Sequence, residues 1–186
     1  MRPGMSDLVG QIRIMADAGT ADYTAGTVVM WTDDQLQTML DRNMTEFYRE
    51  PTVPVITYDA ANTPVYKTHW LPYQYIEGGT AFVLQTADGG SVSASYSLDY
   101  ANGKLTFTSN QGGTVYYATG RYYDVNLAAS EVWRQKAANA AKYYSFSTDN
   151  HRFDRAALMK QFMEMSKYYA AQAGPQVGSL ERGDLR

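Results

Sequence analysis

The sequence predicts an α+β protein with a four-helix bundle core, an inserted antiparallel β region and an extended C-terminal tail. Residues 1–50 and 125–173 carry apolar side chains at helical spacing and are expected to supply the N-terminal and C-terminal helices of the bundle. Residues 51–124 consist of short runs rich in Val, Ile, Thr and Tyr, separated by turn-forming dipeptides. Residues 174–186 have few apolar side chains, so they are expected to form an extended tail.

Two helices are expected before residue 51. The first places Leu8, Ile12 and Met15 on one face and is expected to end at Gly19. The second begins in VVMWTDDQLQTMLDRN, where its start is fully specified: Thr32 is the N-cap, Gln35 completes a capping box, and Trp31 and Leu36 occupy the positions of a hydrophobic staple. Its apolar stripe is expected to continue to Tyr48, with Pro51 after its end; the members are Leu36, Met39, Leu40, Met44, Phe47 and Tyr48.

Six strands are expected in the β region. They are PVITYD, VYKTHW, AFVLQT, SVSASYSLDY, KLTFTS and TVYYATGRYY. The links are short, so the strands should pair as antiparallel hairpins, and Asn102-Gly103 is the strongest turn signal. Alternating residues such as Leu105 and Phe107 should be buried.

Two further helices are expected after the β region. The first, in LAASEVWRQKAANAAKYYSF, is rich in alanine and therefore allows a neighbouring helix to approach closely. The second runs from about Asp154 to Ala173, with a stripe of Leu158, Phe162, Met165 and Tyr169. None of the four helices can bury its stripe alone, so the helices from both ends of the chain are expected to pack together.

Composition narrows the function classes. The 186 residues carry a net charge of −3, which disfavours general nucleic-acid binding. The chain has no cysteine, which excludes disulfides and thiolate metal sites, and folding in a reducing cytosol is expected. No apolar run is long enough to span a bilayer and no secretory signal is expected. The 16 tyrosines indicate either a contact surface or simply a β-rich region.

The charge is unevenly distributed. Residues 1–50 contain four basic and eight acidic side chains, residues 51–123 three and four, and residues 124–186 nine and seven. The net charges of −4, −1 and +2 would suit head-to-tail contact between copies of the chain, although salt screens such an effect.

No catalytic, metal or cofactor site is expected. The sequence contains no nucleotide-binding G-x-x-x-x-G-K-[ST] or G-x-G-x-x-G motif, no hydrolase G-x-S-x-G motif and no zinc-protease H-E-x-x-H motif. Neither His69 nor His151 has an acidic residue or a cysteine at a spacing typical of a metal or catalytic site. The segment STDNHRFD, residues 147–154, lacks the central Gly and the closing Glu of a calcium-binding loop. The paired tyrosines at 116–117, 122–123, 143–144 and 168–169 could stack on bases or sugars, but they lack interleaved basic residues apart from Arg121. We therefore predict that the protein is not an enzyme.

Four motifs in order resemble the head–tail connector (adaptor or head-completion) proteins of tailed bacteriophages. They are W-T-D-x-x-L-x-x-x-L-D at Trp31 to Asp41, G-x-x-x-F at Gly103 to Phe107, Y-D-V at Tyr123 to Val125, and F-S-x-D-x-x-x-F-x-R at Phe146 to Arg155. The resemblance spans most of residues 6–173. The β region is longer and richer in tyrosine than the simplest members of that family carry.

The resemblance implies a virion structural protein at the head–tail interface (the neck), made in the bacterial cytoplasm. It implies a homo-oligomeric ring, expected to be twelvefold, that lies under the portal protein and extends the DNA channel without sequence-specific DNA binding. The ring would be the platform for a stopper or tail-completion protein. The tail would dock into the portal through Gln176, Val177, Leu180, Arg182, Leu185 and Arg186.

The alternative is a binding module in which the tyrosine-rich β region recognises a carbohydrate or another virion protein. In the connector hypothesis, the sharply defined helix start at residues 31–36 fixes the packing angle of a ring subunit, because an angular error repeats at every interface.

Overall fold

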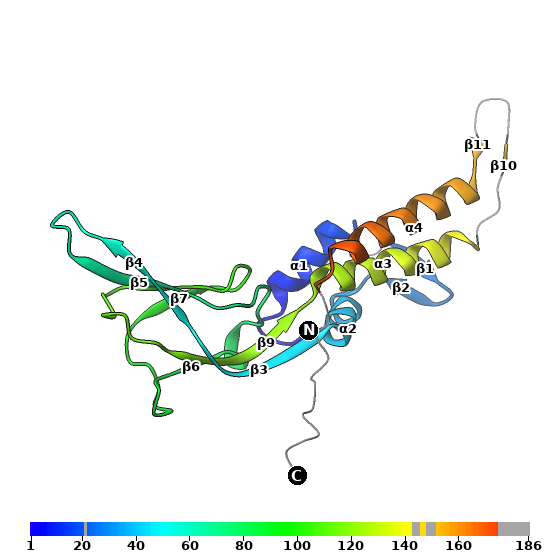
Figure 1. The fold of residues 1–186 in the computed structure, drawn as a ribbon. Coiled ribbons are helices and arrows are strands. Elements are labelled where there is room, and N and C mark those ends of the chain that lie inside the picture. The colour runs from blue at the N-terminus through cyan, green and yellow to red at the C-terminus, as the bar shows by residue number, and fades with distance from the viewer. Residues whose placement is uncertain (21, 143–145, 148–151, 175–186) are drawn as a thin grey trace, which may run out of the picture.

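The computed structural model describes residues 1–20, 22–142, 146–147 and 152–174. Four helices and eleven strands are found in these residues. The molecule is elongated, with most of the sheet at one end and a pair of long helices at the other (Figure 1). The elements are α1 (Ser6–Met15), β1 (Tyr23–Ala25), β2 (Val28–Met30), α2 (Asp33–Arg42), β3 (Met44–Pro51), β4 (Val53–Tyr58), β5 (Pro64–Trp70), a 3-10 turn (Gly79–Ala81), β6 (Val83–Gln85), β7 (Tyr96–Asp99), β8 (Lys104–Phe107), β9 (Tyr117–Tyr123), α3 (Val125–Ala140), β10 (Phe146–Ser147), β11 (Arg152–Phe153) and α4 (Arg155–Gln172).

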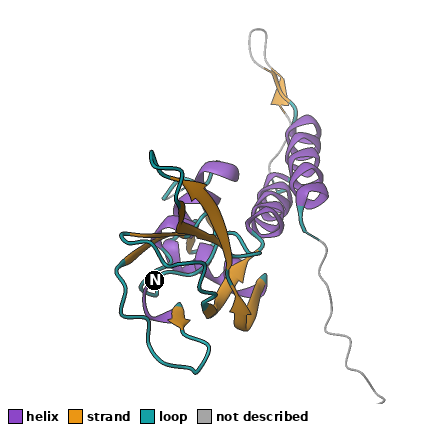
Figure 2. Ribbon diagram, turned by 60° about the vertical axis from the view of Figure 1, so that its left-hand side comes forward, coloured by secondary structure: helices purple, strands orange, loops and turns teal. Residues whose placement is uncertain are grey.

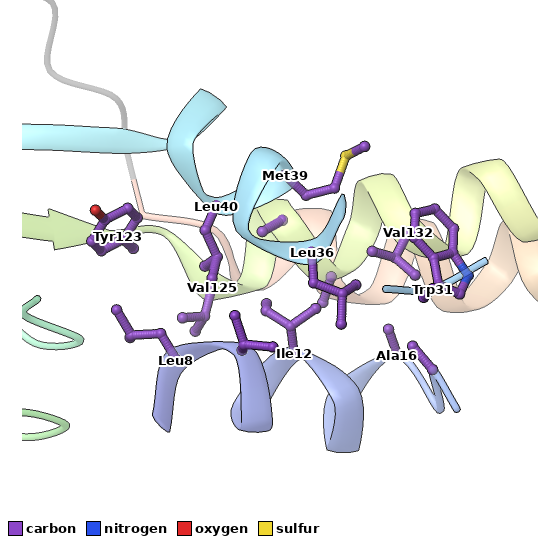
Figure 3. Close-up of a cluster of buried hydrophobic side chains, with 14 of the residues drawn as sticks. Leu8, Ile12, Ala16, Trp31, Leu36, Met39, Leu40, Tyr123, Val125 and Val132 are labelled. Carbon is purple, nitrogen blue, oxygen red and sulfur yellow. The ribbon is translucent and has the colours of Figure 1, made fainter. Parts of the chain in front are cut away.

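The helical half is built around α3. Helices α1 and α2 pack against α3 and against each other, and α4 lies along α3 (Figure 1). Side chains from α1, α2 and α3 meet in one hydrophobic core, drawn in Figure 3, and the β1–β2 hairpin and the end of β9 also contribute to it. Ile12, Leu36 and Val132 are among its buried members.

Helix α1 ends at Met15, four residues before the predicted end at Gly19. Asp17 adopts a left-handed conformation with φ of 47°. The backbone N–H of Ala18 then donates to the carbonyl of Arg13 at 3.0 Å, the hydrogen bond that closes a helix through a left-handed residue. The following residues form the β1–β2 hairpin, which the sequence analysis did not predict.

Helix α2 ends at Arg42, so the predicted helical stripe through Met44, Phe47 and Tyr48 is wrong. These residues lie in β3, which pairs antiparallel with β9 from Met44↔Tyr123 to Pro51↔Tyr117. Alternation along a strand explains their exposure: Phe47 is buried, whereas its neighbour Tyr48 is exposed. Pairing with β9 therefore overrides a spacing that also fits a helix.

The six predicted strands of the β region all overlap observed strands, and every pairing is antiparallel. Two sheets have the orders β3-β9-β6 and β4-β5-β8-β7, and β1-β2 and β10-β11 form two-stranded sheets. The hairpins β4–β5 and β7–β8 are as expected, but β6 pairs with the distant β9. Figure 2 shows the two larger sheets on one side of the two long helices.

A second hydrophobic core lies within the β region. Leu105 and Phe107 are buried in it, as predicted, and the other buried members come from β3, β6, β9 and the segment after β5. Phe107 stacks on Tyr116 with ring centroids 5.1 Å apart. The β region thus has its own interior and does not depend on the helices for burial.

The predicted four-helix bundle core is wrong. The described chain is a mixed α/β protein rich in antiparallel sheet, with a helical core at one end and a sheet core at the other. The physical reason is length: α1 and α2 have ten residues each, or about 15 Å, and cannot run beside the 16 and 18 residues of α3 and α4 as bundle partners. In the described part of the chain, no helix is long and apolar enough to cross a membrane.

Candidate functional site

The start of α2 has both hydrogen bonds of a capping box. The backbone N–H of Gln35 donates to Thr32 Oγ1 at 3.3 Å, and the backbone N–H of Thr32 donates to Gln35 Oε1 at 2.9 Å. Asp33 and Asp34 lie in the first turn, where their charge favours the positive end of the helix dipole. Two backbone donors that helix geometry leaves unpaired are therefore satisfied.

The two staple residues, Trp31 and Leu36, are fully buried in the helical core (Figure 3). The guanidinium of Arg13 on α1 donates to the carbonyl of Trp31 at 3.0 Å and to the carboxylate of Asp33 at 2.6 Å. The rings of Tyr23 and Trp31 pack in a T-shaped arrangement with centroids 6.4 Å apart. The beginning of α2 is thus fixed to α1 and to the β1–β2 hairpin at one point.

A buried charge network joins the helical half to the sheet half. Glu77, in the segment between β5 and β6, is 1% exposed. Arg2 Nε donates to Glu77 Oε1 at 2.6 Å, and Arg2 Nη2 donates to Asp41 Oδ1 of α2 at 2.8 Å. The Tyr123 hydroxyl, at the end of β9, donates to Glu77 Oε2 at 2.5 Å. Side chains from four separate segments are therefore linked through Arg2 and Glu77. We call Arg2, Asp41, Glu77 and Tyr123 the junction network.

The electrostatics of the junction network follow from burial and hydrogen bonding. Hydrogen bonds to Glu77 and Asp41 raise the pKa of Arg2, which keeps the guanidinium charged. Burial, followed by the hydrogen bond to Glu77, raises the pKa of Tyr123 well above its usual range, which keeps the phenol protonated as a donor. Arg121 Nη1 lies 3.8 Å from Glu77 Oε2 and adds a second cation.

A cavity of about 500 Å³ lies beside the junction network. Its lining includes both arginines, Glu77 and Glu46, and Arg121 Nε donates to Glu46 Oε1 at 3.0 Å. These charges already pair with one another, so the cavity offers no unpaired charge to a ligand. Among the described residues, no group of three or more His, Cys, Asp or Glu side chains could hold a metal ion.

The histidine that the structure describes is a core residue. His69 is fully buried, its Nδ1 lies 3.1 Å from Thr52 Oγ1, and its ring packs edge-on against Phe107. Burial lowers its pKa, so the ring is held neutral. His151 lies outside the described residues.

The tyrosine pairs that the structure describes do not form a stacking platform. Tyr116 and Tyr123 are buried. Tyr122 stacks on Tyr73 with centroids 4.5 Å apart, and desolvation raises the pKa of Tyr73 to about 12. In the α4 pair Tyr169 packs inward and Tyr168 is 58% exposed, and the pair at 143–144 lies outside the described residues.

Exposed apolar side chains occur on both halves of the molecule. On the sheet half they include Val53, Ile56 and Tyr58 of β4 and Trp70 of β5; on the helical half they include Met159 and Tyr168 of α4. The sheet order makes β4 an edge strand. Surfaces of this kind mark contact sites more often than catalytic ones.

The residues expected to dock the tail into the portal lie outside the described residues; they are Gln176, Val177, Leu180, Arg182, Leu185 and Arg186. The chain is held just before them. The backbone N–H of Gly174 donates to Asp124 Oδ2 at 3.0 Å, and Asn126 Nδ2 donates to the carbonyl of Gln172 at 3.2 Å. The end of α4 is therefore fixed beside the start of α3.

Sequence reasoning found the helix start but missed the junction network. Arg2 and Glu77 are 75 positions apart and neither belongs to a local motif, so no pattern in the sequence pairs them. No family model, no curated protein and no solved structure matches this chain.

Proposed function

We propose that this chain is a structural subunit of the head–tail connector of a tailed bacteriophage. Copies form a ring under the portal protein, extend the channel through which genomic DNA passes, and provide a platform for a stopper or tail-completion protein. The four motifs between Trp31 and Arg155, and their order along the chain, suggest the family. The twelvefold symmetry and the neck location are implied by that resemblance.

The observation that carries the proposal is the apolar surface left exposed on both the sheet half and the helical half of the subunit. Tyr58 and Val53 of β4 are each 61% exposed, and Tyr168 of α4 is 58% exposed. A subunit that contacts a neighbour on each side needs two separate contact surfaces. The sheet half and the helical half of this elongated molecule provide them (Figure 1).

The rigid construction of the subunit supports the same proposal. The capped start of α2 fixes the helical half, and the junction network fixes the helical half to the sheets. Ring closure requires each subunit to hold one shape, since an angular error adds up around the ring.

Imaging the purified protein by cryo-electron microscopy, alone and with a portal ring, tests the proposal. We expect closed rings that stack coaxially on the portal. Deleting residues 175–186 should abolish portal binding and leave the subunit fold intact. A protein that stays monomeric and ignores the portal would contradict the proposal.

A binding module is the second candidate, because aromatic side chains are exposed on the β4-β5-β8-β7 sheet. Tyr58, Trp70 and Tyr96 are 61%, 40% and 37% exposed. Lys104 Nζ lies 5.8 Å from the centroid of the Trp70 ring, so one face of that ring is already covered. This candidate would be favoured if the full chain forms no rings but binds glycans, and if Tyr58→Ala abolishes that binding.

A further inference from the structure

Helix α4 contains more apolar residues than its limited burial in the structure would require. Of its 18 residues 11 are apolar, and they are distributed around the helix: Ala156, Ala157, Leu158, Met159, Phe162, Met163, Met165, Tyr168, Tyr169, Ala170 and Ala171. A helix that is apolar on all sides is normally buried. In α4, however, Ser166 is the one buried residue.

The side of α4 that faces α3 accounts for part of this composition. Phe162 packs against Trp133 with ring centroids 5.4 Å apart, and Ser166 Oγ lies 3.0 Å from Ser130 Oγ in a buried contact. These contacts fix which face of α4 points inward. Tyr168 lies on the opposite side of the helix and is 58% exposed, whereas Met159 shares the side of Phe162 and Ser166 and is 38% exposed.

Helix α1 has an uncovered apolar side chain of its own. Leu8, Val9 and Ile12 are buried, whereas Ile14 is 79% exposed. Asp7, Gln11 and Ile14 are spaced by four and three residues, so they share the outer face of the helix. Ile14 is thus an exposed apolar residue at the C-terminal end of an otherwise polar outer stripe.

The two surfaces carry opposite charge. On α1, Asp7 lies on the exposed outer face, whereas Arg13 is paired with Asp33 of α2. Helix α4 has Arg155, Lys160 and Lys167 against Glu164, a net charge of +2. Complementary charges of this kind select a partner and its orientation.

Within one chain, α1 does not cover the exposed side of α4. Figure 1 shows α4 along α3, on the side away from α2, and both Ile14 of α1 and Tyr168 of α4 remain exposed. A second copy can bring its α1 to the exposed side of α4.

We propose that the outer face of α4, around Tyr168 and Lys160, packs against the outer face of α1, around Ile14 and Asp7, of the next copy. The contact joins two different surfaces, so it repeats from copy to copy and closes into a ring when the rotation allows. The inference rests on the proposed ring and names the surfaces that build it.

Engineered cysteines test the contact directly, because the chain has none of its own. The full chain is prepared as Ile14→Cys and, separately, as Tyr168→Cys, and the two are mixed and treated with a short bismaleimide. We expect a mixed dimer that neither variant gives alone. A chain carrying both substitutions should give a ladder of dimers, trimers and larger species.

Tyr58→Cys is the matched control, since Tyr58 is as exposed as Tyr168 but lies on β4. Mixed with Ile14→Cys, it should give no dimer. Dimers from either helix variant alone, or equal yield from the control, would overturn the assignment. Rings seen by electron microscopy without the Ile14–Tyr168 product would overturn the interface and leave the connector proposal standing, whereas a monomer that forms no product and ignores the portal would overturn both.

Charge reversal provides a second measurement. Lys160→Glu with Lys167→Glu should weaken self-association about tenfold at low salt, corresponding to about 1.4 kcal/mol from surface pairs. Mixing this variant with Asp7→Lys should restore part of the loss. An association constant that is unchanged by the double reversal would contradict the charge pairing.

Discussion

Removing the cation of the junction network should destabilise the protein far more than removing a surface cation. In Arg2→Met, the Glu77 carboxylate stays buried but loses the guanidinium 2.6 Å away. Breaking a buried ion pair typically costs about 3–5 kcal/mol, because the remaining charge has no close partner. The side chain of Arg2 is 34% exposed and Arg121 remains 3.8 Å from Glu77, so we expect the low end, about 3 kcal/mol.

Urea denaturation followed by tryptophan fluorescence measures this cost. With a slope of about 2 kcal/mol per molar, the midpoint should fall by about 1.5 M. Arg42→Met is the matched control, because the Arg42 side chain is 59% exposed and its nearest carboxylate oxygen is 4.0 Å away. It should change stability by no more than about 0.5 kcal/mol.

A double variant separates the charge from the packing of the side chain. Arg2→Met with Glu77→Gln removes the buried charge together with its cation, and should be more stable than Arg2→Met alone by about 1 kcal/mol or more. Equal midpoints for Arg2→Met and Arg42→Met, or a double variant no more stable than the single one, would refute this account of the junction.

Three further predictions concern individual elements. Burial lowers the pKa of His69, so the unfolded chain takes up a proton below about pH 6.5 that the folded chain resists; stability should therefore fall by up to about 1.4 kcal/mol per pH unit below that value. His69→Phe should lose this slope in urea titrations at pH 7.5 and 5, and an unchanged slope would contradict the assignment. Gly103→Ala should lower the thermal midpoint more than Gly112→Ala: both have positive φ, but a Cβ on Gly103 would lie 2.0 Å from the carbonyl oxygen of Tyr73, and one on Gly112 meets nothing within 4 Å. Thr32→Ala should cost about 1 kcal/mol in chemical denaturation, and adding Trp31→Ala should cost several more and abolish ring assembly; intact stability and rings would contradict the role of the helix start.

Elements with strong local signals could be predicted from the sequence. The capped start of α2, the Asp154 start of α4 and the Asn102-Gly103 hairpin each depend on residues close together in the chain. Their hydrogen bonds form within a few residues, so composition and spacing are enough.

The elements that were missed depend on partners far away in the chain. The spacing of Met44, Phe47 and Tyr48 fits a helix, and only pairing with β9, more than 60 residues later, makes it a strand. A register shift between Phe47 and Glu50, where Arg49 has φ of 50°, further disguises the alternation. The junction network likewise has no local pattern, since it joins Arg2 to Glu77 and Tyr123 across the fold.

The error in fold class has the same origin. The prediction that helices from both ends of the chain pack together is confirmed for α1, α2 and α3, whose side chains share one core. The predicted bundle failed because residues 44–50 join the sheet and because the β region has a core of its own. Where a helix ends and how much of the interior the strands supply are set by tertiary contacts.

Electron microscopy of the purified full chain with a portal ring tests the central claim most directly. The account predicts closed rings seated coaxially on the portal, in which α4 of each subunit contacts α1 of the next. Isolated monomers beside bare portals, at protein concentrations high enough to saturate a stable complex, would contradict it.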